Sequence, residues 1–178
     1  MATFKEVSLS SKLYDEIALK IRNSYPNACI LYIDEVINPE LYDSYMNKKN
    51  ELITLRGDLS ITEKLLFHGT SHKNINSIAA VGFLTCKNKV AAFGHGSYFS
   101  TMASYSKNYS VSYTDDISYM FLCDVIIGKF GIYGDYATIN TDIHDNSVNS
   151  VHNPTIYVTP YDAGAYPKYL IAYHRNAI

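Results

Sequence analysis

The sequence predicts an α+β fold in which helices flank a mainly antiparallel sheet. Helical periodicity marks residues 10–25 and 38–53, whereas three later runs are rich in β-branched and aromatic residues: "ISYMFLCDVIIGK" (117–129), "TIYVTPY" (155–161) and "KYLIAYH" (168–174). The last two runs are too short and too close in sequence for a crossover helix to join them. We therefore expect an antiparallel sheet.

The first half of the chain supplies the clearest element boundaries. Ser10 or Ser11 caps a predicted helix whose apolar residues share one face, namely Leu13, Ile17, Ala18 and Ile21. The run "ACILYIDEVI" (28–37) predicts a strand. Asn38 then caps a second helix, with Pro39 in its first position.

Two motifs follow. In "LLFHGTSHKN" (65–74), residues 64–67 predict a buried strand that delivers His68 to a cleft, and residues 69–71 predict a turn. A short helix over 73–83 is closed by Gly82. In "GHGSYFSTMASYSKNYS" (94–110), a strand ends at 98–99 and Ser100 caps a helix that carries one face of side chains: Met102, Tyr105, Ser106 and Tyr109.

Composition limits the classes of function. A chain of 178 residues that is 47% hydrophobic suits one compact core, so we expect a single domain over 1–178. The net charge is −2 and the 15 Lys and Arg residues are scattered, which makes nucleic acid an unfavourable partner without excluding it. No apolar run is long enough to span a membrane. Three cysteines without metal-ligand spacing and a start without a signal peptide predict an intracellular protein, cytoplasmic or nuclear, with no metal.

Two long polar segments, 86–96 and 137–153, are expected to be loops that flank a binding site.

Each of the two motifs, taken alone, also has a purely structural interpretation. A lone histidine at a strand end is more often a hydrogen-bonded structural residue, and a tyrosine and methionine stripe on a helix is more often core. The 17 tyrosines fit either a core or stacking on a planar ligand.

The order and spacing of the two motifs resemble those of the poly(ADP-ribose) polymerase-like ADP-ribosyltransferases. The flanking segments are similar to that family as well, both before the histidine (24–53) and in the closing strands (153–173). The resemblance implies the ADP-ribosyltransferase fold, with two packed, mainly antiparallel sheets and a cleft for NAD. It implies that NAD is a co-substrate.

The resemblance also implies roles for single residues. His68 would hydrogen-bond a ribose hydroxyl, the Gly69 main chain would clamp the nicotinamide carboxamide, and Ser106 would add a hydrogen bond to that amide. Tyr98 and Tyr109 would enclose the nicotinamide ring. The implied NAD-binding set is His68, Gly69, Thr70, Asn74, Tyr98, Ser106 and Tyr109. In the loop over the dinucleotide, 86–94, this chain lacks an arginine that some relatives use near the adenine.

The third catalytic position departs from that of the polymerases. Chain-extending relatives carry a glutamate where the register of "NPTIYV" places Ile156, and no glutamate follows Glu63. A carboxylate about 5 Å from the developing cation would contribute about 3 kcal/mol at an effective dielectric of ~20, or about two decades in rate. It would also activate the 2′-hydroxyl of an ADP-ribose already attached.

His68, Tyr98 and Ile156 therefore resemble the catalytic set of the mono-ADP-ribosyltransferase branch. The expected acceptor is an Asp or Glu side chain of a protein, with the enzyme itself as one candidate, and no regulatory helical subdomain is expected in this chain. Two alternatives remain open: an NAD- or ADP-ribose-binding module of the same fold with weak or no catalysis, and an enzyme that modifies nucleic-acid ends.

Overall fold

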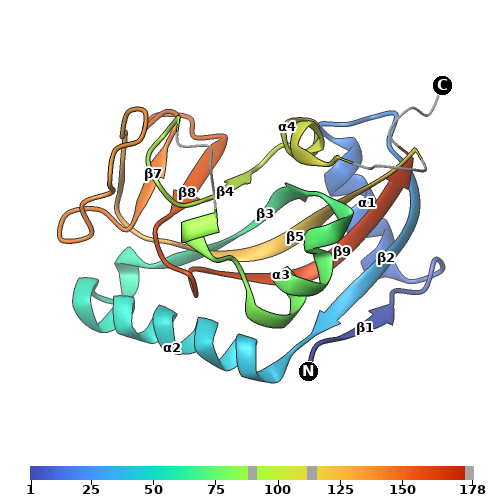
Figure 1. Cartoon of the computed structure of the whole chain (residues 1–178), viewed down its shortest axis with the longest axis horizontal. Helices are drawn as coiled ribbons and strands as arrows, with labels where there is room; N and C mark the ends of the chain where they lie inside the picture. The colour runs from blue at the N-terminus through green and yellow to red at the C-terminus, as the bar shows by residue number, and fades with distance from the viewer. Residues whose placement is uncertain (88–91, 112–115, 175–178) are drawn as a thin grey trace.

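A computed structural model describes residues 1–87, 92–111 and 116–174 (Figure 1). The described residues form one hydrogen-bonded sheet with the strand order β1-β2-β9-β5-β3-β4-β8-β7-β6. The strands are β1 Thr3–Glu6, β2 Cys29–Ile37, β3 Thr62–Thr70, β4 Ser97–Ser100, β5 Ile117–Ile127, β6 Phe130–Gly131, β7 Asn146–Val148, β8 Ile156–Thr159 and β9 Ala165–His174. The α-helices are α1 Lys12–Arg22, α2 Pro39–Arg56, α3 Ile75–Val81 and α4 Ala103–Ser106, and the 3₁₀ turns are η1 Asp58–Ser60, η2 His72–Asn74, η3 Thr85–Lys87 and η4 Lys107–Tyr109.

The α+β prediction is confirmed, and so is the antiparallel pairing, with the exception of β6 and β7, which run parallel. We expected two packed sheets, but the strands form one hydrogen-bonded sheet. The pairing within it is shortest between β3 and β4. Strand β3 pairs with β5 over nine residues on one side, but with β4 only through Phe67 and Ser100. Strands β8 and β9 are not neighbours, because β8 pairs with β4 and β9 pairs with β2 and β5.

The helix boundaries follow the predicted caps. Ser11 accepts a hydrogen bond from the Tyr14 N–H at 3.1 Å, and Asn38 accepts one from the Leu41 N–H at 3.2 Å with Pro39 behind it. Gly82 ends α3 with φ +78°, so the expected positive φ is present.

Other boundaries differ from the prediction. Strand β3 continues through Gly69 and Thr70, where we expected a turn, because β5 pairs with it as far as Tyr119. Helix α4 has only four residues and begins after Met102, so Ser100 is not its cap; its hydroxyl instead accepts from the Met102 N–H. Strands β1, β6 and β7 were not predicted.

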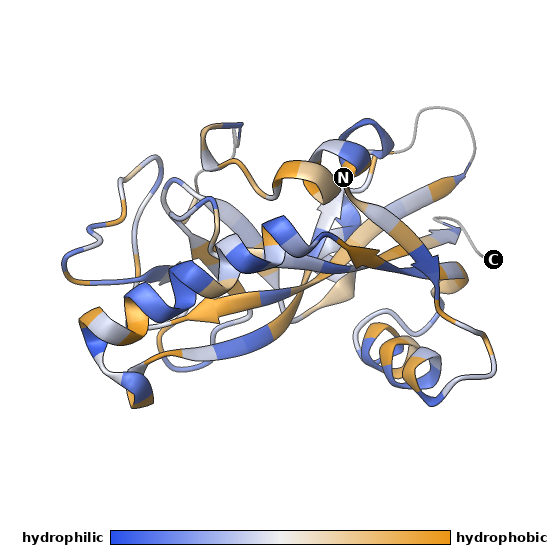
Figure 2. Cartoon of the chain, turned by 90° about the horizontal axis from the view of Figure 1, so that it is seen from below, coloured by the Kyte–Doolittle hydropathy of each residue, from blue (hydrophilic) through white to orange (hydrophobic). Residues whose placement is uncertain are grey.

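Helices α1 and α3 cover opposite faces of the sheet. Ile17 and Ile21 of α1 belong to a buried cluster with Phe67, whereas Ile75 and Ile78 of α3 belong to another, which includes the neighbouring residue Leu66. Since successive side chains of a strand point to opposite faces, each helix buries its own face. Figure 2 shows the sheet between helical segments, with hydrophobic residues both on strands and on the helical segments beside them. Both faces of β3 are thus fixed by packing next to His68.

Asn38 ties two helices together. Its side chain is 3% exposed, caps α2, and donates hydrogen bonds to the Ala79 and Ala80 carbonyls of α3 at 2.9 and 3.0 Å.

We expect Asn38→Ala to lower the free energy of unfolding by about 3 kcal/mol, because one cap is lost and buried carbonyls lose their donor. The matched control Ser11→Ala removes a cap and one exposed hydrogen bond, from the Ser11 hydroxyl to the Ser8 carbonyl, and should cost about 1 kcal/mol. Urea denaturation of both variants tests this, and equal losses would contradict it.

Candidate functional site

The site begins where β4 leaves β3. The Phe67 carbonyl accepts a hydrogen bond from the Ser106 hydroxyl at 3.1 Å, so the main-chain polar groups of Phe67 face the β4 side. Because main-chain groups of a strand alternate between its two edges, those of Gly69 face the same side. The pairing of β3 with β4 consists of Phe67 and Ser100, which leaves the N–H and C=O of Gly69 on an open edge.

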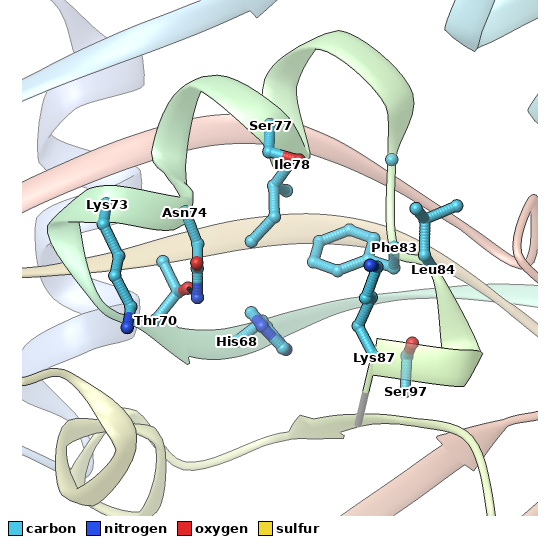
Figure 3. A pocket seen from close by; sticks show the side chains of 11 residues that line it. His68, Thr70, Lys73, Asn74, Ser77, Ile78, Phe83, Leu84, Lys87 and Ser97 are labelled. Carbon is cyan, nitrogen blue, oxygen red and sulfur yellow. Dashed lines mark hydrogen bonds between the residues drawn. The ribbon is translucent and has the colours of Figure 1, made fainter. Parts of the chain in front are cut away.

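Two cavities of about 310 and 490 Å³ lie along this edge. The smaller is lined by Gly69, Ser106 and three tyrosines, and the larger runs along α3 (Figure 3). Four residues line both: His68, Thr70, Asn74 and Lys87. The two cavities are therefore lobes of one cleft.

His68 bridges the opening between the strands. Its Nδ1 lies 2.8 Å from the Tyr98 carbonyl oxygen. A carbonyl only accepts, so Nδ1 carries the hydrogen and Nε2 of the neutral ring is an acceptor. The ring packs against Phe83 and Phe99 at centroid distances of 4.8 and 5.4 Å. Burial lowers the pKa of His68, and the hydrogen bond to Tyr98 opposes that shift only in part, so the Nε2 lone pair is present at neutral pH.

Gly69 is required by packing as well as by the cleft. A Cβ built there would lie 1.8 Å from the Ser106 carbonyl oxygen. Strand β3 and the backbone of α4 therefore approach each other only with glycine at this position. Ser106 is buried, and its single hydroxyl hydrogen goes to Phe67, so toward a ligand it acts as an acceptor.

Three tyrosines line the smaller lobe. The Tyr98 hydroxyl donates to the Gly94 carbonyl at 2.8 Å and accepts from the Phe93 N–H at 2.9 Å, and burial raises its pKa. The hydroxyls of Tyr105 and Tyr109 share a hydrogen bond of 3.0 Å, and the centroids of the two rings lie 5.4 Å apart. Tyr109 remains 41% exposed, which leaves its ring accessible to a planar ligand.

Residues 11–155 match the sequence profile of the poly(ADP-ribose) polymerase catalytic domain. The chain belongs to this family. It is 31% identical to human protein mono-ADP-ribosyltransferase PARP14, over 96% of this chain and 10% of that protein. It is 31% identical to mouse PARP12 and 30% identical to mouse PARP11, both named protein mono-ADP-ribosyltransferases, over 98% and 96% of this chain and 26% and 61% of theirs. The chain thus spans a tenth to about three-fifths of these relatives' lengths.

The remaining residues implied by family resemblance lie as follows. Thr70 is buried, and its hydroxyl oxygen accepts from the Asn74 side chain at 3.5 Å, so both lie on the wall shared by the lobes. Ile156, in β8, pairs with Ser100 of β4 and is 7% exposed. Strand β4 separates it from Phe67, which lies in β3. It does not line either lobe as described, but Ile156 and Tyr98 point to the same face of the sheet.

The lining residues that sequence reasoning did not assign to the site include Lys73, Phe83, Lys87 and Tyr105. Tyr105 was assigned to the correct helix face, and its spacing of four from Tyr109 was the available signal. The others come from short 3₁₀ turns or loops without a periodic pattern. Of the two predicted loops, the first reaches the cleft at Lys87, while its residues 88–91 lie outside the described residues. The second, 137–153, contains β7 and does not line either lobe as described.

Within the described ranges, no helix is both long and apolar enough to cross a membrane, and no group of three or more His, Cys, Asp or Glu residues could hold a metal ion.

The lowered pKa of His68 predicts a specific pH dependence. Protonation of Nε2 removes the acceptor, so the affinity for a ligand that donates a hydrogen bond to Nε2, with NAD as the probe, should be constant above the ordinary histidine pKa of 6.5 and fall only below it. The unfolded chain takes up this proton first, so the contribution of His68 to stability is present above 6.5 and lost as pH falls. Calorimetric titrations across this range test the claim. A fall in affinity that begins above pH 6.5 would contradict it.

Proposed function

We propose that this chain transfers single ADP-ribose units from NAD to a protein acceptor and releases nicotinamide. The observation that carries the proposal is the convergence in one cleft of the open Gly69 edge, the Tyr98 and Tyr109 rings, and a histidine whose Nε2 can only accept. Family membership and the names of the relatives support it. In the reaction the bond from ribose C1′ to the nicotinamide nitrogen breaks, nicotinamide leaves with the electron pair, and an acceptor oxygen bonds to C1′.

The smaller lobe suits the nicotinamide. The carboxamide would pair its N–H with the Gly69 carbonyl and its C=O with the Gly69 N–H, which replaces the partners that β4 does not supply. Ser106 would accept the second amide hydrogen, since its own hydrogen is used on Phe67. Tyr98 and Tyr109 would contact the ring faces, at about 0.5–1.5 kcal/mol for each aromatic pair beyond the buried area.

His68 orients the ribose. With Nδ1–H held by the Tyr98 carbonyl, Nε2 is aimed by the protein and accepts from a ribose hydroxyl without reorientation. The same hydrogen bond couples β3 to β4, so the position of the ribose and the width of the cleft depend on one side chain.

The cleft favours transfer of a single unit. The described residues that line the two lobes include no Asp or Glu, and the position that is glutamate in chain-extending relatives is the buried Ile156. The enzyme would thus offer no carboxylate to the developing cation and none to activate a ribose hydroxyl for elongation. A carboxylate acceptor brings the negative charge itself and needs no proton removed, so Asp and Glu acceptors are favoured.

Purified protein incubated with labelled NAD should yield single ADP-ribose additions to itself or to an added protein, resolved by mass spectrometry of the modified peptides. His68→Asn keeps a donor near Nδ1 and loses the Nε2 acceptor, and should slow transfer by about two decades. Tyr14→Phe, on α1, is the control and should react like wild type. Polymer ladders would refute single-unit transfer, and NAD binding without any transfer would identify a binding module.

The acceptor linkage gives a separate prediction. Neutral hydroxylamine cleaves ester-linked ADP-ribose and leaves serine ethers intact. Treatment of the labelled product should therefore release most of the label. Retention of most of it would show that hydroxyl or amine acceptors are used, and the carboxylate argument would fail while single-unit transfer stood.

A further inference from the structure

Two lysines on the cleft walls have no role in the proposed chemistry. Lys73 of η2 lines the larger lobe, and Lys87 of η3 lines both lobes. In Figure 3, Lys73 and Lys87 enter from different turns on either side of the cavity, with Thr70 and His68 between them.

Neither lysine forms an ion pair with another described residue. The described lining residues of the two lobes include no carboxylate. The ion pairs between described residues involve other cations: Lys12, Lys48, Lys49, Arg56 and Lys168. The lining of the cleft therefore carries two lysines without an ion pair, which suits an anionic part of a ligand.

The position of Lys87 indicates which part of the ligand carries the negative charge that these lysines would meet. The smaller lobe holds the groups that suit a nicotinamide, and the larger lobe continues past Ser77 and Ile78. A dinucleotide that occupies both lobes places its central pyrophosphate at their junction. Of the four residues common to both lobes, Lys87 is the only one with a permanent charge, because His68 is neutral and Thr70 and Asn74 are uncharged.

The backbone before Lys87 is anchored from a distant part of the chain. Asp162, in the turn between β8 and β9, accepts from the Thr85 N–H at 2.8 Å and from the Thr85 hydroxyl at 2.7 Å. The Lys87 N–H then donates to the Leu84 carbonyl at 3.0 Å, which closes the 3₁₀ turn. Asp162 is therefore suited to be a positioning residue for Lys87.

We propose that Lys87, with Lys73 on the opposite wall, binds the pyrophosphate of the donor, and that Asp162 positions Lys87 through Thr85. The inference rests on the proposed function, because it requires NAD in this cleft. The two ends of the donor should then depend differently on Lys87: affinity for the ADP-ribose portion depends on it, and affinity for nicotinamide does not.

The test is calorimetric titration with ADP-ribose, which contains the pyrophosphate, and with nicotinamide, which does not. Lys87→Met should weaken ADP-ribose binding by about tenfold, the scale of one solvent-screened, charge-assisted contact. It should also reduce the dependence of that affinity on salt. Lys87→Arg should retain most of the affinity, and Lys12→Met, on an exposed side chain of α1, is the matched charge control. Nicotinamide binding should be unchanged in all three.

Asp162→Ala should weaken ADP-ribose binding in the same direction, and the effect should largely disappear in the Lys87→Met background. Normal ADP-ribose affinity in Lys87→Met would overturn the inference and leave the proposed function intact. So would an equal loss for nicotinamide, since that indicates a structural effect. Failure of the wild-type protein to bind ADP-ribose would overturn both, whereas binding without transfer would overturn the proposed function alone.

Discussion

The hydrogen bond from His68 Nδ1 to the Tyr98 carbonyl holds the sheet together at the place where its ladder stops. Strand β3 is fully paired with β5 but touches β4 through one residue pair, so the remaining edge of β3 faces the cleft. The bond fixes the separation of β3 and β4 and, at the same time, the tautomer that leaves Nε2 as an acceptor. The spacing of the two strands and the acceptor role of Nε2 therefore depend on one hydrogen bond, between His68 Nδ1 and the Tyr98 carbonyl oxygen.

Close backbone approaches set the shape around this bond. A Cβ at Gly69 would meet the Ser106 carbonyl oxygen at 1.8 Å, and one at Gly96, where φ is +157°, would meet the Thr159 carbonyl oxygen at 2.3 Å. Gly69 and Gly96, one in each motif, are thus required by packing. For this reason Gly69 substitutions report on folding as much as on ligand binding, and substitutions at His68 or Lys87 are the sharper probes of the site.

Much of this arrangement could be predicted from the sequence, because local signals and the fold agree. Ser11 and Asn38 cap the helices as expected, and His68, Gly69, Tyr98, Ser106 and Tyr109, which lie up to 41 residues apart in the chain, line the same small lobe. Their order and spacing, and the family resemblance that they support, supplied the signal. No single motif was sufficient.

The parts that could not be predicted depend on tertiary contacts. Gly69 and Thr70 read as a turn, but pairing with β5 keeps them in a strand. Lys87 lies in a polar loop without periodicity, and only the contact of Thr85 with Asp162, 77 residues away, shows what holds that turn. Strands β6 and β7 have two and three residues, too few for an alternating pattern. That β3 and β4 belong to one sheet follows from a single pair in the ladder, Phe67 with Ser100, which no local pattern signals.

The most direct test of the account is a crystal structure of the protein with a non-transferable NAD analogue, in which a carbon–carbon bond joins the ring to the ribose. The account predicts that the carboxamide pairs with the Gly69 main chain, that a ribose hydroxyl donates to His68 Nε2, and that the ligand extends through both lobes. A ligand bound outside the cleft, or a His68 ring turned so that Nδ1 leaves the Tyr98 carbonyl, would contradict it.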